Sequence, residues 1–192
     1  DMALDSFNAL PDEMKKILTE AAAVGDATAR AIAFHYRSSD AFYYPNSAWQ
    51  YAFVGGYKFQ SQPGVSNLDG AAFYYFFATG VTPAMEAKMV GMGSQYPWTA
   101  LDADGKPFDG GKTYKLTLPK DVPVKDFWSV IVYDVQTRSM LQTNQAAPSV
   151  SSQNKDVKVN ADGSVDVFFG PKAPEGMESN WVETIPGKGW FM

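Results

Sequence analysis

The sequence VKVNADGSVDVFF occupies residues 157–169 and is the stretch that decides the fold class. Apolar residues alternate with polar ones in residues 157–160 and again from residue 165 to 169. Alternation at a period of two is typical of a strand with one buried face. The residues in between, 161–164, contain an Asp-Gly pair, which favours a tight turn because glycine adopts positive φ without steric cost. The pattern predicts a β-hairpin.

Three more segments of the second half carry strand patterns. Residues 113–118 (TYKLTL) alternate. Residues 127–133 (FWSVIVY) are apolar on both faces, which predicts a central strand that is covered on each side. Residues 190–192 (WFM) begin a further strand. Short strands separated by Asp-Gly and Pro-Gly turns predict a jelly-roll-like antiparallel β-sandwich domain over residues 94–192.

The first part of the chain, residues 1–93, is predicted to be mainly helical. Pro11 and the acidic residues 12–13 mark a helix start, because proline suits the first turn and carboxylates interact favourably with the positive end of the helix dipole. A Gly-Asp pair at 25–26 predicts a break, followed by a second helix over 27–36. Further expectations are helices at 71–78 and from residue 83, a strand pair at 49–59 and a loop at 60–67. The predicted fold class is therefore α+β, mostly β with an α-helical N-terminal part.

An ordered set of short motifs runs through the second half of the chain. In chain order the motifs are LDADGKPFDG (101–110), YKL (114–116), Pro123, FWSV (127–130), YD (133–134), Arg138, SS (151–152), NADGSV (160–165), FGP (169–171), NW (180–181) and Gly187. This order resembles the C-terminal domain of unknown function 1214. That family is usually paired with an N-terminal domain of unknown function 1254.

The resemblance covers residues 102–192 well and implies a jelly-roll-like β-sandwich. Such domains occur often in bacterial envelope proteins and are broadly similar to the sandwich domains of glycan-cleaving amidases, but the resemblance implies no established reaction. The sequence lacks the usual partner domain and the family's final Arg-Leu-Tyr-Gly-Pro-like strand, so we expect a fragment that is truncated at its C-terminus. The family implies an envelope or secreted location, although no signal peptide is visible in residues 1–5.

Composition excludes several classes of function. The chain has 16 Lys and Arg against 21 Asp and Glu, a formal net charge of −5, and no basic patch. Proteins that bind nucleic acids or anionic membranes neutralise phosphates with clustered basic side chains, so neither partner is expected. Cysteine is absent and His35 is the single histidine, which excludes thiolate chemistry and multi-histidine metal centres. No apolar stretch reaches the roughly 20 residues of a membrane span, and no motif calls for a cofactor.

Three aspartates invite a calcium site, because hard cations prefer clustered carboxylates. These are Asp102, Asp104 and Asp109. A calcium-binding loop of the EF-hand type also needs a ligand at the next alternate position and a glutamate at the twelfth, where this sequence has Lys106 and Thr113. Asp-Gly turns before a strand are common for backbone reasons alone. We therefore interpret the segment as a structural turn and predict no metal site.

Carboxylates offer the one route to catalysis that the sequence leaves open. The candidates are Asp134, Asp166, Glu175, Glu178 and Glu183. A general acid and base need facing carboxyl groups and a raised pKa on one of them, and the sequence indicates neither. Solvated surface charges are the simpler interpretation. His35 is more simply a packing residue than a base, and no serine lies in a GxSxG motif.

Aromatic and polar side chains of the second half form a candidate ligand-binding set. They are Trp128, Tyr133, Arg138, Asn144, Asn180 and Trp181. Aromatic rings stack on the apolar faces of sugars and other small molecules, while amides and guanidinium groups fix orientation. The alternative is that these rings and Trp190 fill the core, and that Arg138 stabilises the fold through a carboxylate or backbone carbonyls. The sequence leaves both interpretations open.

Three functional hypotheses result. The first is a ligand-binding module for a glycan or small molecule, without a catalytic motif or cofactor. The second is a metal-independent hydrolase of amide or glycosidic bonds that uses carboxylates. The third is a structural or assembly domain whose exposed edge strand, near Trp190, pairs with a missing N-terminal domain or with other chains.

Overall fold

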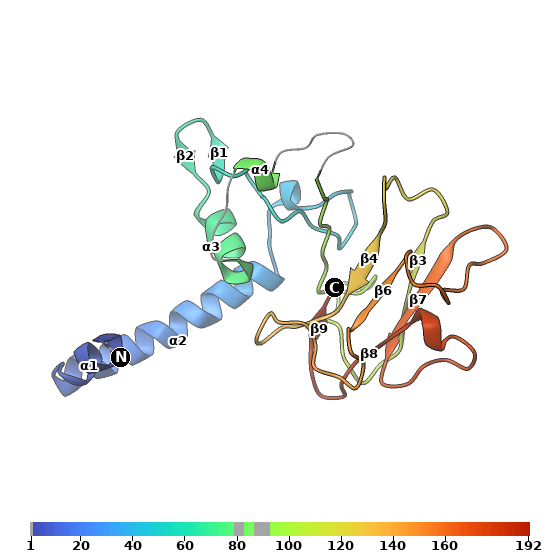
Figure 1. Ribbon diagram of the computed structural model, residues 1–192. Coiled ribbons are helices and arrows are strands. Elements are labelled where there is room, and N and C mark those ends of the chain that lie inside the picture. Colours follow the sequence, from blue (N-terminus) through green and yellow to red (C-terminus); the bar gives the residue numbers. More distant parts are fainter. Residues whose placement is uncertain (1, 79–82, 87–92) are drawn as a thin grey trace. The chain divides into compact units, whose positions relative to one another are not determined.

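The computed structural model of the chain describes residues 2–78, 83–86 and 93–192. Its helices are α1 (Met2–Asn8), α2 (Asp12–Phe34), α3 (Leu68–Phe77) and α4 (Pro83–Glu86), with 3₁₀ turns η1 (Ser39–Ala41) and η2 (Glu178–Asn180). Its strands are β1 (Gln60–Gln62), β2 (Val65–Ser66), β3 (Tyr114–Leu118), β4 (Ser129–Ile131), β5 (Tyr133–Asp134), β6 (Ser149–Ser151), β7 (Val165–Gly170), β8 (Trp181–Glu183) and β9 (Trp190–Phe191). The predicted α+β class is confirmed (Figure 1).

The chain divides into two compact units. The first contains residues 1–41 and 52–87, and the second contains residues 42–51 and 88–192. All four described helices belong to the first unit, together with the small hairpin of β1 and β2. Strands β3 to β9 belong to the second unit, so the α and β parts of the fold are largely segregated along the sequence.

The first unit is organised by the packing of α3 against α2. Asn67 begins α3, because its Oδ1 accepts the Gly70 N–H at 2.8 Å and the Tyr36 hydroxyl at 3.3 Å. The ring of Phe34 in α2 meets Phe76 in α3 edge to face, with centroids 5.6 Å apart. The helix predicted at residues 71–78 is therefore confirmed, one turn longer at its start.

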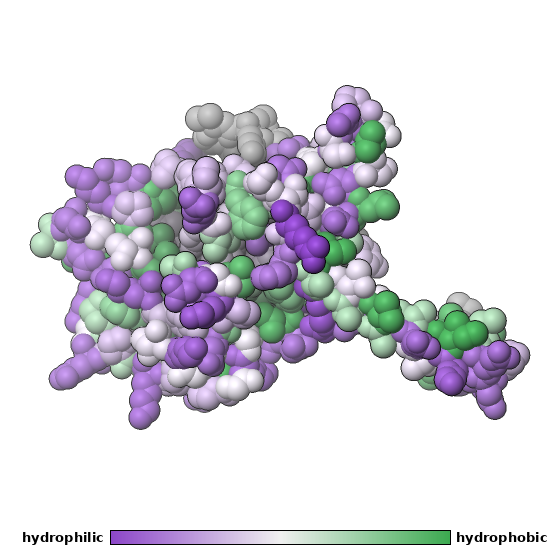
Figure 2. All heavy atoms as spheres, turned by 180° about the vertical axis from the view of Figure 1, so that it is seen from behind, coloured by the Kyte–Doolittle hydropathy of each residue, from purple (hydrophilic) through white to green (hydrophobic). Residues whose placement is uncertain are grey.

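Helix α2 runs without interruption from Asp12 to Phe34, so the predicted break at Gly25 and Asp26 is wrong. One interior glycine costs a helix about 1 kcal/mol relative to alanine, which the flanking turns can offset. Asp26 instead accepts a hydrogen bond from Arg30 Nε at 2.8 Å along the same helix. Four large apolar side chains of α2 are exposed, namely Met14, Ile17, Leu18 and Val24. Figure 2 shows hydrophobic and hydrophilic residues interspersed on the surface.

The segment between η1 and α3 differs from prediction. Residues 49–59 form no strand pair, and in this stretch only Gln50 makes isolated bridges. Residues 60–67, predicted as a loop, contain the antiparallel hairpin of β1 and β2. The aromatic residues of this stretch favour strands, but Gly55 and Gly56 both adopt positive φ and turn the chain before β1. Of the helix predicted from residue 83 the structure describes α4, and the rest lies outside the described residues.

The main sheet of the second unit has the strand order β3-β7-β8. Strands β3 and β7 are antiparallel, with Tyr114 opposite Phe169, whereas β7 and β8 are parallel. Two further two-stranded sheets pair β4 with β6 and β5 with β9, both antiparallel. The strands predicted at 113–118, 165–169 and 190–192 are confirmed.

The predicted hairpin partner of β7, residues 157–160, is not a strand. The side chain of Asn180 occupies the place of a partner strand here, because its Oδ1 accepts the Lys158 N–H and its Nδ2 donates to the Lys158 carbonyl, both at 2.8 Å. The turn itself is present, with the Asn160 N–H donating to the Ser164 carbonyl at 2.8 Å. Strand β7 therefore pairs with β3 rather than with the preceding segment.

The central strand predicted at residues 127–133 is split between two sheets. Its first part is β4, which pairs with β6, and its last residue opens β5, which pairs with β9. Between them lies Val132, which is fully buried and donates to the Pro148 carbonyl at 3.0 Å. Phe127 is half exposed. The prediction was wrong because the segment changes partners at Val132 and is not covered on both faces at its start.

One hydrophobic core connects the sheets of the second unit. Its buried members are Phe108, Val132, Leu141, Val150, Val165, Val167, Phe169, Val182 and Trp190. Trp190 stacks on Phe108 with ring centroids 4.2 Å apart and an interplanar angle of 9°. Strands β3, β6, β7, β8 and β9 all contribute to this core or pack against it, so the loops that leave these strands start from one shared core.

Candidate functional site

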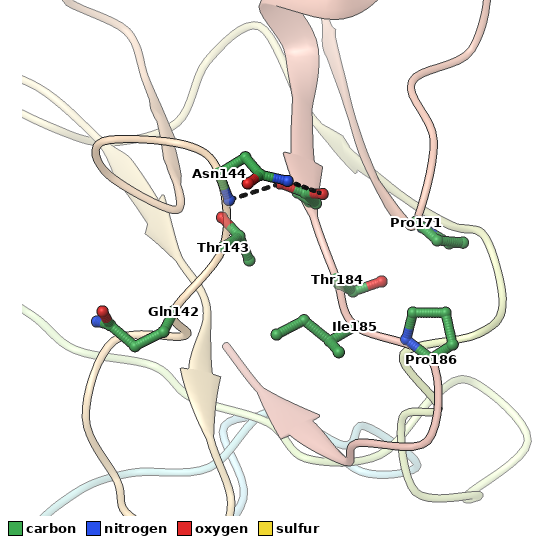
Figure 3. Close-up of a pocket in the computed structure, with 8 residues that line it drawn as sticks. Gln142, Thr143, Asn144, Pro171, Thr184, Ile185 and Pro186 are labelled. Carbon is green, nitrogen blue, oxygen red and sulfur yellow. Dashed lines mark hydrogen bonds between the residues drawn. The ribbon is translucent and has the colours of Figure 1, made fainter.

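A pocket of about 400 Å³ opens at the surface of the second unit (Figure 3). Its lining residues are Gln142, Thr143, Asn144, Pro171, Glu183, Thr184, Ile185 and Pro186. They come from three segments: the loop before β6, the residue after β7, and the end of β8 with the residues that follow. The parallel pairing of β7 and β8 brings the second and third segments side by side.

The loop before β6 is fixed along β8 by one side chain. The Glu183 N–H donates to Gln145 Oε1 at 2.8 Å, and Gln145 Nε2 donates to the Trp181 carbonyl at 3.1 Å. This amide satisfies the backbone groups on the side of β8 away from β7. Gln145 therefore fixes the neighbouring lining residues 142–144 beside β8, the strand that contains Glu183.

The Glu183 carboxylate is oriented by Asn144. The Asn144 backbone N–H donates to Glu183 Oε2 at 3.0 Å, and Asn144 Nδ2 donates to Oε1 at 3.3 Å (Figure 3). A carboxylate oxygen has two acceptor sites, so each oxygen retains capacity for one more bond. Among the residues that the structure describes, no Lys or Arg forms an ion pair with Glu183. The carboxylate is positioned but not neutralised.

The remaining wall of the pocket is apolar and built on the core. Ile185 packs against the core cluster, and the side chains of Pro171 and Pro186 also line the pocket. Buried Thr184 anchors this wall, because its Oγ1 donates to the Gly110 carbonyl at 2.8 Å. A Cβ on Gly110 would lie 2.1 Å from the Ile185 carbonyl oxygen, so only glycine allows the two backbones to approach this closely.

Comparison with known proteins assigns a family to the region that contains this pocket. The family model described as "Protein of unknown function (DUF1214)" matches residues 93–192, just over half of the chain. The chain belongs to the DUF1214 family. This finding confirms the resemblance carried by the ordered motifs, and all lining residues of the pocket lie in the DUF1214 region.

A solved structure is also similar to the chain. It is the VPA0106 protein from Vibrio parahaemolyticus, at 21% sequence identity and a TM-score of 0.47. The match covers 67% of this chain and 30% of that protein, so the present chain spans less than a third of its length. No curated protein matches the chain.

Of the six residues predicted for ligand binding in the DUF1214 region, Asn144 lines the pocket. Trp128 is partly buried against the core, and Tyr133 stacks on Phe191 with centroids 5.2 Å apart. The indole N–H of Trp181 donates to the Gly170 carbonyl at 2.9 Å. The three aromatic residues therefore support the β unit from separate positions and are not gathered around the pocket.

Arg138 and Asn180 are engaged within the fold. Arg138 has a positive φ of 59°, its N–H donates to the Asp134 carbonyl at 2.8 Å, and its guanidinium donates to the Gln136 carbonyl at 2.6 Å. This matches the interpretation that Arg138 stabilises a turn through backbone carbonyls. Asn180 is fully buried and bonds Lys158 and the Asp166 carbonyl, so its amide has a structural role.

Sequence reasoning missed most of the pocket lining. Glu183 was considered only as a catalytic acid, and the two prolines and Ile185 were not considered at all. The available signal was the run of four amide or hydroxyl residues at 142–145 (QTNQ). Two of them, Asn144 and Gln145, bond Glu183, and local sequence patterns do not reveal this contact between distant segments.

Two of the other candidate acids, Asp134 and Asp166, have partners outside the pocket. Buried Asp134 accepts the Gln136 N–H at 2.6 Å and bonds Lys188 Nζ at 3.0 Å. Burial alone would raise the pKa of Asp134, but these hydrogen bonds and the Lys188 charge outweigh it and lower the pKa. Asp166 bonds the Thr117 hydroxyl at 2.6 Å, which lowers the pKa of its carboxyl. The surroundings of both carboxyl groups therefore favour their charged form.

The aspartate loop before β3 forms a backbone turn. Asp102 Oδ1 accepts the N–H groups of Asp104 and Lys106, both at 2.9 Å, and Asp109 Oδ1 accepts the Gly111 N–H at 2.9 Å. These bonds support the interpretation as a structural turn. Within residues 2–78, 83–86 and 93–192, no group of three or more His, Asp or Glu side chains is placed to hold a metal ion. In the same residues no helix is both long and apolar enough to cross a membrane.

Proposed function

We propose that this protein is a ligand-binding module that takes a glycan or another small polar molecule in the pocket that Asn144 and Glu183 help to line. The observation that carries the proposal is the oriented carboxylate of Glu183, which two Asn144 N–H groups hold beside an apolar wall. Polar groups that fix orientation next to apolar surface are the usual composition of small-molecule sites. Saccharides offer both hydroxyl groups and apolar ring faces.

Binding is favoured over hydrolysis by the acids present. Carboxylate-based hydrolysis needs two acids on opposite sides of the bond to be cleaved, up to about 10 Å apart. Glu183 is the one acid among the lining residues, whereas Asp134 and Asp166 bond Lys188 and Lys115 respectively. The hydrolase hypothesis therefore has no facing pair at this pocket.

The assembly hypothesis loses the edge on which it rested. Strand β9 pairs with β5 on one side. On its other side the Met192 N–H donates to the Thr99 carbonyl at 3.0 Å, and the Thr99 N–H donates to the Met192 carbonyl at 2.9 Å. The strand near Trp190 is thus covered on both sides within the chain.

The proposal also covers the sandwich architecture, the domain bounds, the cellular location and the partner domain. We propose that the small sheets around the shared core form a jelly-roll-like sandwich, with residues 1–93 as the helical segment and residues 94–192 as the β domain. The common core supports this proposal. An envelope or secreted location, and association with a domain of unknown function 1254, follow from the family resemblance alone.

Calorimetric titration against a panel of neutral and amino monosaccharides and disaccharides tests the proposed function. We expect at least one saccharide to bind, and we expect Asn144→Ala to weaken its binding about tenfold, because the variant removes the side-chain donor to Glu183 Oε1 and leaves the carboxylate held by the backbone N–H alone. Gln153→Ala, at an exposed position outside the pocket, is the matched control and should bind as the wild type does. An equal affinity for the Asn144→Ala variant would place the ligand elsewhere.

A further inference from the structure

The charges and hydrogen bonds of the pocket specify the kind of ligand, an inference that rests on the proposed function. Glu183 is the one charged residue among the lining side chains. Its bonds come from the neutral N–H groups of Asn144, which orient the carboxylate without cancelling its charge. A ligand that reaches this carboxylate meets a net negative charge.

Three of the lining side chains donate hydrogen bonds within the protein. Asn144 Nδ2 donates to Glu183, Gln142 Nε2 donates to the Met140 carbonyl at 3.4 Å, and Thr184 Oγ1 donates to the Gly110 carbonyl at 2.8 Å. In addition to the Glu183 carboxylate the wall offers the side-chain amide oxygens of Asn144 and Gln142 as acceptors. The Glu183 carboxylate is thus flanked by further acceptor oxygens, and it carries the one formal charge of the lining.

We infer that the pocket binds a protonated primary amine, and that the ligand class is an amino sugar. An ammonium group carries one positive charge and three N–H donors, which complement one carboxylate and neighbouring acceptors. The apolar wall formed by Pro171, Ile185 and Pro186 suits the apolar face of a sugar ring. An anionic ligand would be repelled by the Glu183 carboxylate. The net charge of −5 on the chain also favours cations over anions in approach.

The test compares sugars that differ at one substituent. Glucosamine, at a pH where its amine is protonated, is titrated beside glucose and N-acetylglucosamine into the full chain at low ionic strength. We expect glucosamine to bind about tenfold more tightly than either neutral sugar, and its affinity to fall as salt is added. Glu183→Gln should remove the preference for glucosamine. Glu175→Gln changes the charge by the same amount at an exposed position outside the pocket and should retain it.

The outcomes separate this inference from the proposed function. If the three sugars bind wild type and Glu183→Gln equally well and with no salt dependence, the ammonium specificity is wrong while the ligand-binding function stands. If none of the sugars binds, the ammonium inference is wrong and the proposed saccharide function fails with it. The salt dependence is measured on the unmodified chain, so the inference can be tested even if Glu183→Gln does not fold.

Discussion

Asn180 shows how one side chain completes the hydrogen bonding of the β unit. Its amide bonds both backbone groups of Lys158 and the Asp166 carbonyl, all at 2.8 Å, in a fully buried position. Gln145 does the same for β8. Side-chain amides substitute for strands because a carboxamide has the same donor and acceptor groups as a peptide bond.

We expect Asn180→Ala to lower the free energy of unfolding by about 3 kcal/mol, because several buried backbone groups lose their partners. Urea unfolding followed by tryptophan fluorescence measures the loss. Gln153→Ala, an exposed amide, should change stability by less than about 0.5 kcal/mol. Equal effects of the two substitutions would show that the Asn180 amide does not support the fold.

The lowered pKa of Asp134 predicts that the stability of the fold depends on pH. Its pKa in the folded chain is lowered, because hydrogen bonds from Gln136 and Lys188 outweigh the effect of burial. A lowered folded-state pKa stabilises the fold above the unfolded-state pKa, and this contribution is lost as pH falls through the folded-state pKa. Because the Lys188 side chain is half exposed, the backbone hydrogen bonds carry most of the effect.

We therefore expect Asp134→Asn to destabilise the fold at neutral pH, and the difference from wild type to shrink below about pH 4. Urea unfolding at a series of pH values measures this difference. Asp156→Asn, at an exposed position, serves as the control and should stay within about 0.5 kcal/mol of wild type. A difference between Asp134→Asn and wild type that is constant down to pH 2 would contradict the assignment.

At the scale of elements, two glycines have opposite roles. Gly25 lies inside α2, and a Cβ placed there would meet no atom within 4 Å. Gly110 lies behind the pocket wall, where a Cβ would lie 2.1 Å from the Ile185 carbonyl oxygen and 2.8 Å from that of Lys188. The first glycine is tolerated by the fold, whereas the second is required.

Alanine substitutions should separate the two positions. We expect Gly25→Ala to stabilise α2 by about 1 kcal/mol, because alanine has the higher helix propensity. Gly110→Ala should destabilise the β unit by about 1–3 kcal/mol, because the backbone must shift to admit the methyl group. Guanidinium unfolding followed by circular dichroism compares the variants. A loss of helix in Gly25→Ala would show that the chain needs a break there.

The sequence could predict the strands in which alternation of apolar and polar residues coincides with pairing to another strand. Tyr114 and Leu116 alternate and lie in β3, and the same holds for Val165 and Val167 in β7. Prediction failed where a side chain or a change of partner decided the outcome. Residues 157–160 alternate as a strand does, but they bond the Asn180 amide instead of a strand.

At the scale of the whole molecule, long-range pairing limits what sequence can reveal about the site. Strands β7 and β8 are parallel, so a connection separates them and no hairpin signal announces the pairing. This pairing places Pro171 beside residues 183–186, and Gln145 then aligns Asn144 with Glu183. The sequence could predict Asn144 as a polar ligand-binding candidate, but not the carboxylate that it orients.

The most direct test of the pocket is a ¹⁵N NMR titration of the full chain with glucosamine. The backbone and side-chain N–H groups of Asn144 donate to Glu183, so their resonances report on any group that reaches the carboxylate. We predict saturable shifts of these resonances together with those of Thr143 and Ile185, and saturation only at about tenfold higher glucosamine concentration in Glu183→Gln. Saturable shifts confined to other parts of the chain, with Asn144 unchanged, would contradict a ligand site at this pocket.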